Sequence, residues 1–278
     1  MSETFGVRLQ ERIRDLGPLC VGIDPGSTLI ESWGRSDSVD GLEFFSLAVL
    51  EAVLDTAAAI KPQVSYFERF GAQGYRVLER LLEEARDANV LIIADVKRGD
   101  IGSTNEGYAE AWLGDSSPLR VDALTLNPYL GIDSLLPFVR RARESGRGAF
   151  ILSGTSNAEG RQIQLARNAE NVSVEELVLR GVAEINAQED SLGSLGVVLG
   201  ATRERPAFDL SQLGGPYLVP GVGAQGATPD QVARLFDRCP SGTVLVNVGR
   251  SILGAGPERS ALRDAARRWR DDLSGVLL

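Results

Sequence analysis

Short apolar runs recur along the chain and alternate with longer segments of helical spacing. Each run covers six or seven residues, and together they lie at 19–24, 59–64, 91–96, 123–128, 149–154, 196–202, 217–222 and 243–249. Nearly continuous apolar content over so short a length is typical of strands in a parallel sheet, because both faces of such a sheet are covered. The pattern therefore predicts eight parallel strands.

Apolar residues in the intervening segments recur at positions i, i+3 and i+4, which predicts amphipathic helices. The spacing is clear at residues 42–59, 74–88 and 173–188, and in residues 1–16 it predicts an opening helix rather than a secretory signal. Eight strands that alternate with helices favour an α/β fold of the (β/α)8 TIM barrel type. We predict a single domain over residues 1–278, with a doubly wound open sheet as the alternative.

Polar residues lie at or just beyond the end of each predicted strand. They are Asp24, Lys61, Asp95, Lys97, Asn127, Ser153, Ser156, Thr202, Gln225 and Arg250. Active sites of barrels gather at the carboxyl ends of the strands, so these side chains are expected to line one pocket. Two segments without a helical pattern, residues 32–41 and 155–171, are expected on the same face.

Composition narrows the chemistry that this pocket can perform. The chain has no histidine, which excludes Ser-His-Asp and Cys-His nucleophile systems and imidazole metal sites. A net charge of −9 argues against a nucleic-acid partner. Residues 210–229 lack charge but are too rich in Gly, Pro and polar residues to span a membrane. Two distant cysteines, Cys20 and Cys239, suit reduced thiols, so we expect a cytoplasmic protein.

Lysine is rare in this chain. Of 29 basic residues only Lys61 and Lys97 are lysines, and both lie where a strand pattern ends. An ammonium group can donate a proton under physiological conditions, whereas a guanidinium cannot. We interpret the two lysines as chemically required; the alternative is chance survival in a chain whose codon usage favours arginine.

The third strand ends in a group of opposite charges. Residues two apart in a strand share a face, so Asp95 and Lys97 are expected to point together into the barrel mouth. With Lys61 and Asp100 they would form an alternating network that is costly to desolvate, as in active sites; the alternative is an ion pair that only fixes register. A lysine between two carboxylates is suited to act as a general acid, and a carboxylate facing an anionic substrate disfavours its ground state. Loss of CO2 followed by protonation fits both.

A glycine-rich segment, PGVGAQG at residues 220–226, contains the pattern G-x-G-x-x-G. A dinucleotide site is disfavoured, because that pattern should follow the first strand rather than the seventh. In a barrel the loops after strands seven and eight commonly bind phosphate, and Gly221 and Gly223 would allow close backbone approach. Gly249 and Arg250 follow on the next loop, where the guanidinium of Arg250 would add a planar, multidentate grip on the phosphate. The alternative is turn glycines beside a solvated arginine.

Taken in order, these motifs resemble those of a known enzyme family. The D-x-K-x-x-D pattern of Asp95, Lys97 and Asp100 combines with GIDP, IKPQ, TLNPYLG, TSN, PGVGAQG and VGRSI. The set resembles orotidine 5′-phosphate decarboxylases, particularly their longer bacterial subgroup (type 2), from about residue 20 to 253. The resemblance implies conversion of orotidine 5′-monophosphate to uridine 5′-monophosphate and CO2 in pyrimidine biosynthesis, with no metal and no cofactor.

The same resemblance implies roles for individual residues. Lys97 would protonate C6 of the pyrimidine and Asp95 would face the substrate carboxylate. Asp24 and Lys61 would contact ribose hydroxyls. The family's homodimer implies that residues of one subunit complete the site of the other; these are Asp100, Ile101 and Thr104. The other substrate contacts would be Asn127 as a supporting residue, Ser156 (or Ser153) at the pyrimidine, Gln225 in a lid, and Pro220, Gly221, Gly223, Gly249 and Arg250 at the phosphate.

Two other functions are compatible with part of the sequence. A magnesium-dependent sugar-phosphate decarboxylase or lyase of the same suprafamily resembles the chain at D-x-K-x-x-D. Such enzymes carry an acid where Lys61 stands, and an ammonium there would repel a divalent cation. A non-catalytic barrel that binds a phosphate ligand is the third candidate, but binding alone does not require two ammonium groups.

Overall fold

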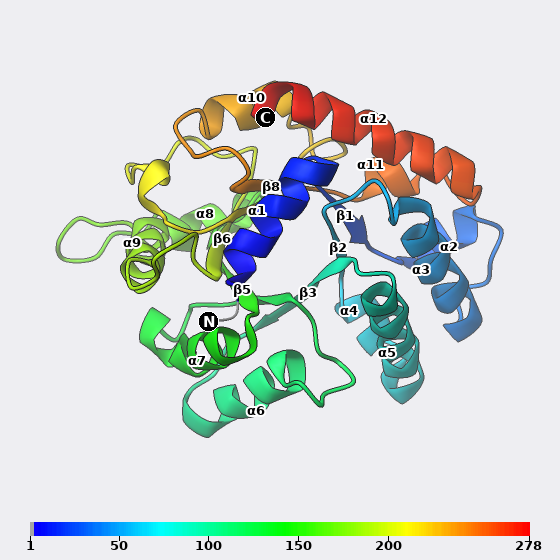
Figure 1. Ribbon diagram of the computed structural model, residues 1–278, viewed down its shortest axis with the longest axis horizontal. Coiled ribbons are helices and arrows are strands. Elements are labelled where there is room, and N and C mark those ends of the chain that lie inside the picture. The colour runs from blue at the N-terminus through cyan, green and yellow to red at the C-terminus, as the bar shows by residue number, and fades with distance from the viewer. Residues whose placement is uncertain (1–2) are drawn as a thin grey trace.

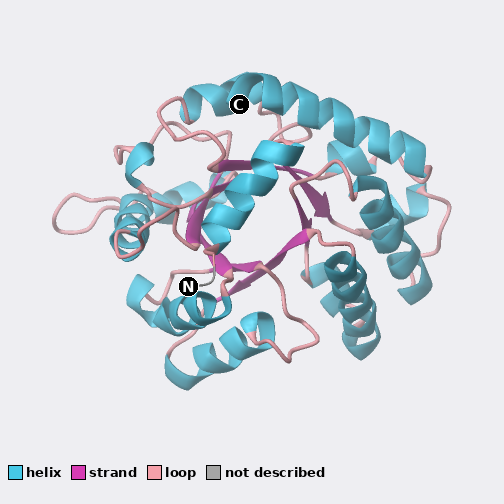
Figure 2. Cartoon of the chain, in the orientation of Figure 1, coloured by secondary structure: helices cyan, strands magenta, loops and turns pink. Residues whose placement is uncertain are grey.

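The strands of this chain close into a barrel. The computed structural model describes residues 3–278, and within them all eight expected strands are present and parallel. Their bounds are β1 Leu19–Ile23, β2 Ala59–Pro62, β3 Leu91–Arg98, β4 Ala123–Leu126, β5 Gly148–Gly154, β6 Leu195–Leu199, β7 Tyr217–Val219 and β8 Val244–Val248. Pairing of β8 with β1 completes the ring, as Figure 2 shows. The (β/α)8 barrel is confirmed, and the open doubly wound sheet is excluded.

Helices surround the barrel (Figure 1). They are α1 Phe5–Leu16, α2 Ser27–Ser32, α3 Val39–Val53, α4 Ser65–Glu68, α5 Gly71–Asp87, α6 Gly102–Leu113, α7 Leu136–Ser145, α8 Arg161–Gln164, α9 Val174–Asn186, α10 Pro229–Leu235, α11 Arg250–Leu253 and α12 Arg259–Leu277. The expectation that residues 155–171 lack helix was wrong, because this segment contains α8 and a 3₁₀ turn at Ala158–Gly160. Turns this short are too brief to show a period in the sequence.

The opening helix closes one end of the barrel. Thr4 caps α1 by accepting a hydrogen bond from the backbone N–H of Val7 at 3.2 Å. Phe5, Leu9 and Ile13 recur every four residues and are fully buried against the barrel interior. The Phe5 ring meets the ring of Phe150 edge-on, with centroids 5.9 Å apart. The helix therefore seals the amino end of the strands, and the site must open at the carboxyl end.

Alternation along β3 shows how the sequence separates the core from the site. Ile93 faces the barrel interior, whereas Ile92, Ala94 and Val96 pack into the larger core between strands and helices. Asp95 continues the inward face one step nearer the carboxyl end. Val96 therefore faces the helices, on the side of the strand opposite to Asp95.

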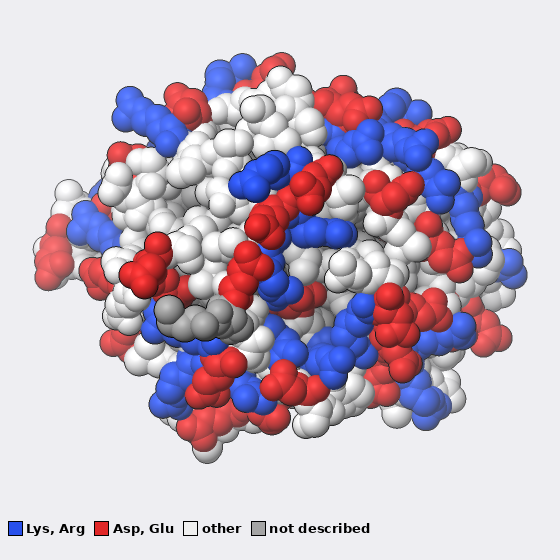
Figure 3. Space-filling model, viewed as in Figure 1, with Lys and Arg blue, Asp and Glu red and all other residues white. Residues whose placement is uncertain are grey.

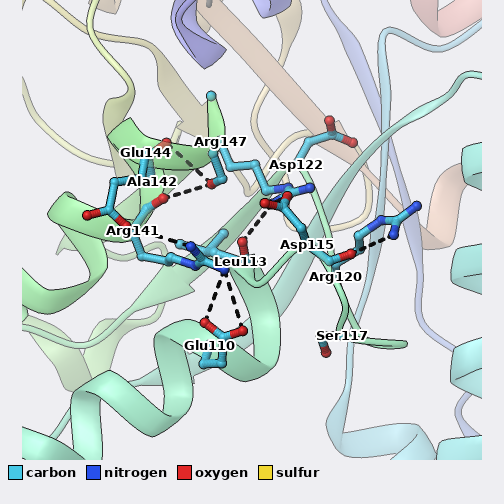
Figure 4. Close-up of polar contacts among 12 residues, drawn as sticks. Glu110, Leu113, Asp115, Ser117, Arg120, Asp122, Arg141, Ala142, Glu144 and Arg147 are labelled. Atoms are coloured by element: carbon cyan, nitrogen blue, oxygen red, sulfur yellow. Dashed lines mark hydrogen bonds and ion pairs between the residues drawn. The ribbon is translucent and has the colours of Figure 1, made fainter.

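Ion pairs and hydrogen bonds hold α6 against α7 (Figure 4). Arg141 lies 3.1 Å from Glu110 of α6. Arg147 donates to the backbone oxygen of Leu113 at 2.6 Å and to Asp115 at 2.8 Å. These pairs are partly exposed and each contributes little to stability, but together they fix the helix whose amino end follows Asp100.

The face that carries α1 shows acidic and basic side chains interspersed, with no continuous basic stripe (Figure 3). This surface gives no sign of the basic footprint that a nucleic acid requires. Among residues 3–278, no helix combines the length and the apolar character needed to cross a bilayer.

Candidate active site

A cavity of about 260 Å³ opens at the carboxyl end of the strands. Its lining comes from all parts of the chain: Asp24, Lys61, Gln63, Asp95, Lys97, Thr125, Leu152, Thr155, Ser156, Asn157, Val198, Leu218, Pro220, Gln225 and Asn247. A second cavity of about 610 Å³ shares Asp24 and Gln225 with the first, so the two adjoin. The rest of its wall is Gly26, Ser27, Thr28, Leu29, Tyr66, Arg69 and Arg250.

A continuous chain of charges lies in the first cavity. The Nζ atom of Lys61 is 2.7 Å from Oδ2 of Asp95, and the Nζ atom of Lys97 is 2.6 Å from Oδ1 of the same carboxylate. Gln63 donates to Oδ2 at 3.0 Å when its amide nitrogen faces Asp95. The two lysines that were singled out in the sequence therefore meet at one carboxylate, as expected.

Mutual attraction fixes the charge states of this group. Burial alone would raise the pKa of Asp95, but the nearby ammonium groups of Lys61 and Lys97 outweigh it and hold the pKa well below its usual range. Burial would lower the pKa of Lys61, yet the carboxylates of Asp95 and Asp24 raise it above its ordinary value. Asp95 is therefore ionised and Lys61 protonated at neutral pH.

The two lysines differ in access to the cavity. The side chain of Lys61 is 7% exposed and lies within β2, whereas that of Lys97 is 45% exposed at the end of β3. Lys97 also has a backbone φ of +47°, a conformation that is uncommon for a residue with a side chain. Both lysines border the cavity, and Lys97 presents the more accessible ammonium to a ligand there.

Two buried oxygen atoms in the cavity wall lack partners. Oδ1 of Asp24, just after β1, and Oδ1 of Asn247, on β8, make no hydrogen bond within residues 3–278. Burial raises the pKa of Asp24, while the charge of Lys61 opposes that change. Buried acceptors are nearly always paired in folded proteins, so both atoms are suited to accept hydrogen bonds from ligand hydroxyl or N–H groups. The absence of a side chain at Gly249 leaves space for the carboxylate of Asp24, because a Cβ at position 249 would lie 3.0 Å from Oδ2 of Asp24.

Asp100 does not join the charged network of its own chain. Its carboxylate accepts a hydrogen bond from the backbone N–H of Ile101 at 2.8 Å, and its backbone N–H donates to Asn105 at 2.9 Å. Asp100 lies beyond the end of β3, where the chain has turned from the rim toward α6. The alternating network expected from the sequence therefore contains, within one chain, Asp24 in place of Asp100.

The segment after Asp100 is exposed. Thr104 is exposed, and Ile101 is exposed over 62% of its surface. Tyr129 and Leu130, which follow β4, are 78% and 52% exposed. Asn105 joins the two loops because it also donates to the backbone oxygen of Ser134 at 2.6 Å. Large apolar side chains exposed on neighbouring loops are typical of a surface that another protein covers.

The geometry distinguishes the two candidate serines. Ser153 is 3% exposed and donates to the backbone oxygen of Glu175 at 3.0 Å, so it is directed toward α9. Ser156 lines the cavity and donates to Oε1 of Gln225 at 2.9 Å. Asn127 does not line the cavity; its side chain accepts from the backbone N–H of Tyr129 at 3.1 Å. Ser156 is the serine available to a ligand, and Asn127 is a turn residue.

The glycine-rich loop after β7 needs its glycines for its shape. Gly221 and Gly223 have φ values of +104° and +76°, and a Cβ at Gly223 would lie 2.5 Å from the hydroxyl of Ser251. Pro220 borders the first cavity, whereas Gly221 and Gly223 border neither. These two glycines position the turn that carries Gln225.

Arg250 begins α11 and borders the second cavity. Within residues 3–278 its guanidinium has no ion pair or side-chain hydrogen bond, and it is exposed. Arg69 lines the same cavity, but Asp37 already binds its guanidinium at 2.7 Å. Arg250 is thus the arginine free to bind an anion there.

Sequence reasoning assigned no role to five polar residues of the first cavity: Gln63, Thr125, Thr155, Asn157 and Asn247. Asn247 had a detectable signal, because it interrupts an otherwise apolar strand. Thr125 did not, since threonine is common in strands. Within residues 3–278, no three Cys, Asp or Glu side chains converge as a set of metal ligands.

Comparison with known proteins places these features in a family. The model of the "Orotidine 5'-phosphate decarboxylase / HUMPS family" matches residues 17–265. The chain is 49% identical to orotidine 5′-phosphate decarboxylase of Streptomyces coelicolor over 96% of both chains, and 44% identical to that of Corynebacterium glutamicum over 98% of both. A solved structure from Streptomyces avermitilis, provisionally described as an orotidine 5′-phosphate decarboxylase, matches with a TM-score of 0.95 and 48% identity, covering 99% of this chain and 96% of that one.

Proposed function

The chain belongs to the orotidine 5′-phosphate decarboxylase/HUMPS family and is a carboxy-lyase, and from this premise we propose that it decarboxylates orotidine 5′-monophosphate without metal or cofactor. Lys97 is the proton donor in this proposal. The observation that carries it is the ion-paired series Lys97, Asp95 and Lys61 at the mouth of the cavity. The product, uridine 5′-monophosphate, belongs to pyrimidine biosynthesis, for which we propose a cytoplasmic location.

The charged series suits a reaction in which a carboxylate leaves. Asp95 is ionised, so a substrate carboxylate beside it is repelled, and that repulsion ends when CO2 departs. The bond between C6 and the carboxylate carbon breaks, and its electron pair remains on C6. Lys97 then transfers a proton from Nζ to C6 and regains one from water. Lys61, fixed by Asp95, stabilises the negative charge that develops nearby.

The two adjoining cavities match the two ends of a ribonucleotide. We assign the pyrimidine and ribose to the first cavity, with Ser156 at the base and Asp24 and Lys61 at the ribose hydroxyls. The free acceptor of Asp24 supports its assignment. We assign the phosphate to the second cavity, with Arg250 as its cation and Gln225 spanning both. In this assignment Pro220, Gly221, Gly223 and Gly249 shape the loops around the ligand.

The exposed apolar surface supports a homodimer. Ile101 follows Asp100 directly, and Tyr129 and Leu130 are exposed on the neighbouring loop after β4. We propose that a second copy of the chain covers this surface, so that Asp100, Ile101 and Thr104 reach the site of the partner. This explains why Asp100 lies outside the charged network of its own chain.

Loss of substrate absorbance on addition of orotidine 5′-monophosphate, with EDTA present throughout, tests the proposed reaction. We expect steady turnover at the same rate with and without the chelator, since the chemistry uses only Lys, Asp and binding groups. Activity that disappears with EDTA and returns with Mg²⁺ would favour the magnesium-dependent alternative. Tight nucleotide binding without any turnover would favour a non-catalytic barrel.

A mixture of two inactive variants tests the shared site. Asp100→Ala and Lys97→Ala homodimers should each be inactive, but exchange of subunits should create heterodimers that hold one intact site. At equal amounts about half of the dimers are mixed and each has one of two sites, so we expect about a quarter of wild-type activity. Differently tagged subunits would measure the exchange. Complete exchange with no recovered activity would contradict the dimer proposal.

A further inference from the structure

The strand that carries Lys97 is irregular where the site begins. Ala94 of β3 pairs with Leu124 of β4, and the next pair joins Arg98 to Leu126. Three residues of β3 therefore lie opposite one residue of β4, Thr125. Such a bulge breaks the backbone ladder and redirects side chains, and bulges are frequent beside active sites.

The side chain of Thr125 replaces the missing ladder bond. Lys97 has a left-handed backbone, and its N–H donates to Oγ1 of Thr125 at 2.9 Å rather than to a strand carbonyl. Thr125 is only 1% exposed, so solvent has little access to this bond. Without the hydroxyl, the amide of Lys97 would have no partner from β4 to hold it in this conformation.

The same hydroxyl also fixes the carboxylate of the site. Thr125 donates to Oδ1 of Asp95 at 2.9 Å, and that oxygen is the one that pairs with Nζ of Lys97 at 2.6 Å. A hydroxyl has one hydrogen to donate and lone pairs to accept, and this arrangement uses both. Thr125 thus links the backbone of Lys97 to the atom that orients its ammonium.

We propose that Thr125 is a positioning residue for the reaction: its hydroxyl holds the bulge in β3 so that Asp95 and Lys97 face the reacting carbon together. The proposal rests on the proposed role of Lys97 as proton donor. Valine has nearly the same shape and would satisfy a purely packing role. The hydroxyl, rather than the volume of the side chain, is what the geometry requires.

Steady-state kinetics of three variants test this role. Thr125→Val should lower kcat by about 10- to 100-fold with KM nearly unchanged, because small misplacements of reacting groups are that damaging while the phosphate end is untouched. Thr125→Ser should keep kcat within about threefold of wild type, since it keeps the hydrogen bonds. Thr243→Val is the matched control. Thr243 is also buried (2% exposed), and its hydroxyl donates to the backbone oxygen of Pro240, at the end of the barrel away from the site. Removal of this hydroxyl should leave kcat unchanged.

A spectroscopic measurement separates this inference from the proposed function. The chain has two lysines, so selective ¹⁵N-lysine labelling should yield two backbone amide signals, with Lys61 as internal reference. In Thr125→Val the Lys97 amide should exchange its hydrogen faster while Lys61 does not. If the wild-type protein showed no decarboxylase activity, the proposed function would be refuted. Hydrogen exchange at the Lys97 amide would still test its hydrogen bond to Thr125, because the exchange rate does not depend on turnover.

Three results would overturn the role of Thr125: wild-type kcat in Thr125→Val, a loss that appears in KM instead, or unchanged exchange at Lys97. Should Thr125→Val fail to fold, Thr125→Cys is to be measured in its place, because a thiol of similar size is a weak donor and acceptor. The same losses are expected there, and their absence would equally overturn the proposal.

Discussion

Replacement of Lys97 by alanine is expected to reduce turnover of orotidine 5′-monophosphate by about 10⁴-fold, the upper range for a positioned general acid. The other lysine cannot substitute, because Lys61 is 5% exposed and its Nζ is committed to Asp95. Affinity for uridine 5′-monophosphate should change little, since the groups assigned to ribose and phosphate remain. Single-turnover kinetics and calorimetry with the product would measure the two effects separately.

Lys97→Arg is the matched control for this variant. Arginine keeps a positive charge beside Asp95 but does not release a proton under physiological conditions. If Lys97 acts as a proton donor, the arginine variant should be nearly as slow as the alanine variant. Recovery of most activity with arginine would mean that charge alone is needed. Substantial turnover by Lys97→Ala would remove the proton-donor role altogether.

The barrel was predictable because its signals are local. Each strand is a compact apolar run, and the helical spacing at residues 1–16, 42–59, 74–88 and 173–188 extends over at least three turns. The inward direction of Asp95 followed from strand alternation alone. The convergence of Asp24, Lys61 and Asp95 then followed from the rule that barrel sites lie at the carboxyl ends of strands.

The parts that sequence did not reveal depend on contacts between strands. The bulge in β3 arises from its register against β4, and no residue of β3 alone marks it. In the sequence Thr125 is therefore indistinguishable from an ordinary strand residue, although its hydroxyl hydrogen-bonds both the backbone N–H of Lys97 and the carboxylate of Asp95. The position of Asp100 was misjudged for a similar reason: spacing places it near Lys97 in sequence, but the turn toward α6 removes it from the network of its own chain.

The second large effect is expected at the far end of the substrate. Arg250 is the guanidinium of the second cavity that no carboxylate binds within residues 3–278, whereas Arg69 is held by Asp37. A charge-assisted hydrogen bond contributes about 1.5–3 kcal/mol, so Arg250→Ala should lower kcat/KM for orotidine 5′-monophosphate by about 10- to 100-fold. The reacting groups around Asp95 are untouched by this change.

The phosphate-free nucleoside provides the internal control. Orotidine has no group for Arg250 to bind, so its kcat/KM should be nearly the same for wild type and Arg250→Ala, and Arg250→Lys should recover part of the loss with the nucleotide. Binding energy from a remote phosphate accelerates the reaction only if it is expressed in the transition state. A loss in kcat as well as in KM would therefore indicate that the phosphate contact helps to assemble the site around Lys97. Equal losses with nucleotide and nucleoside would contradict the assignment of Arg250 to the phosphate.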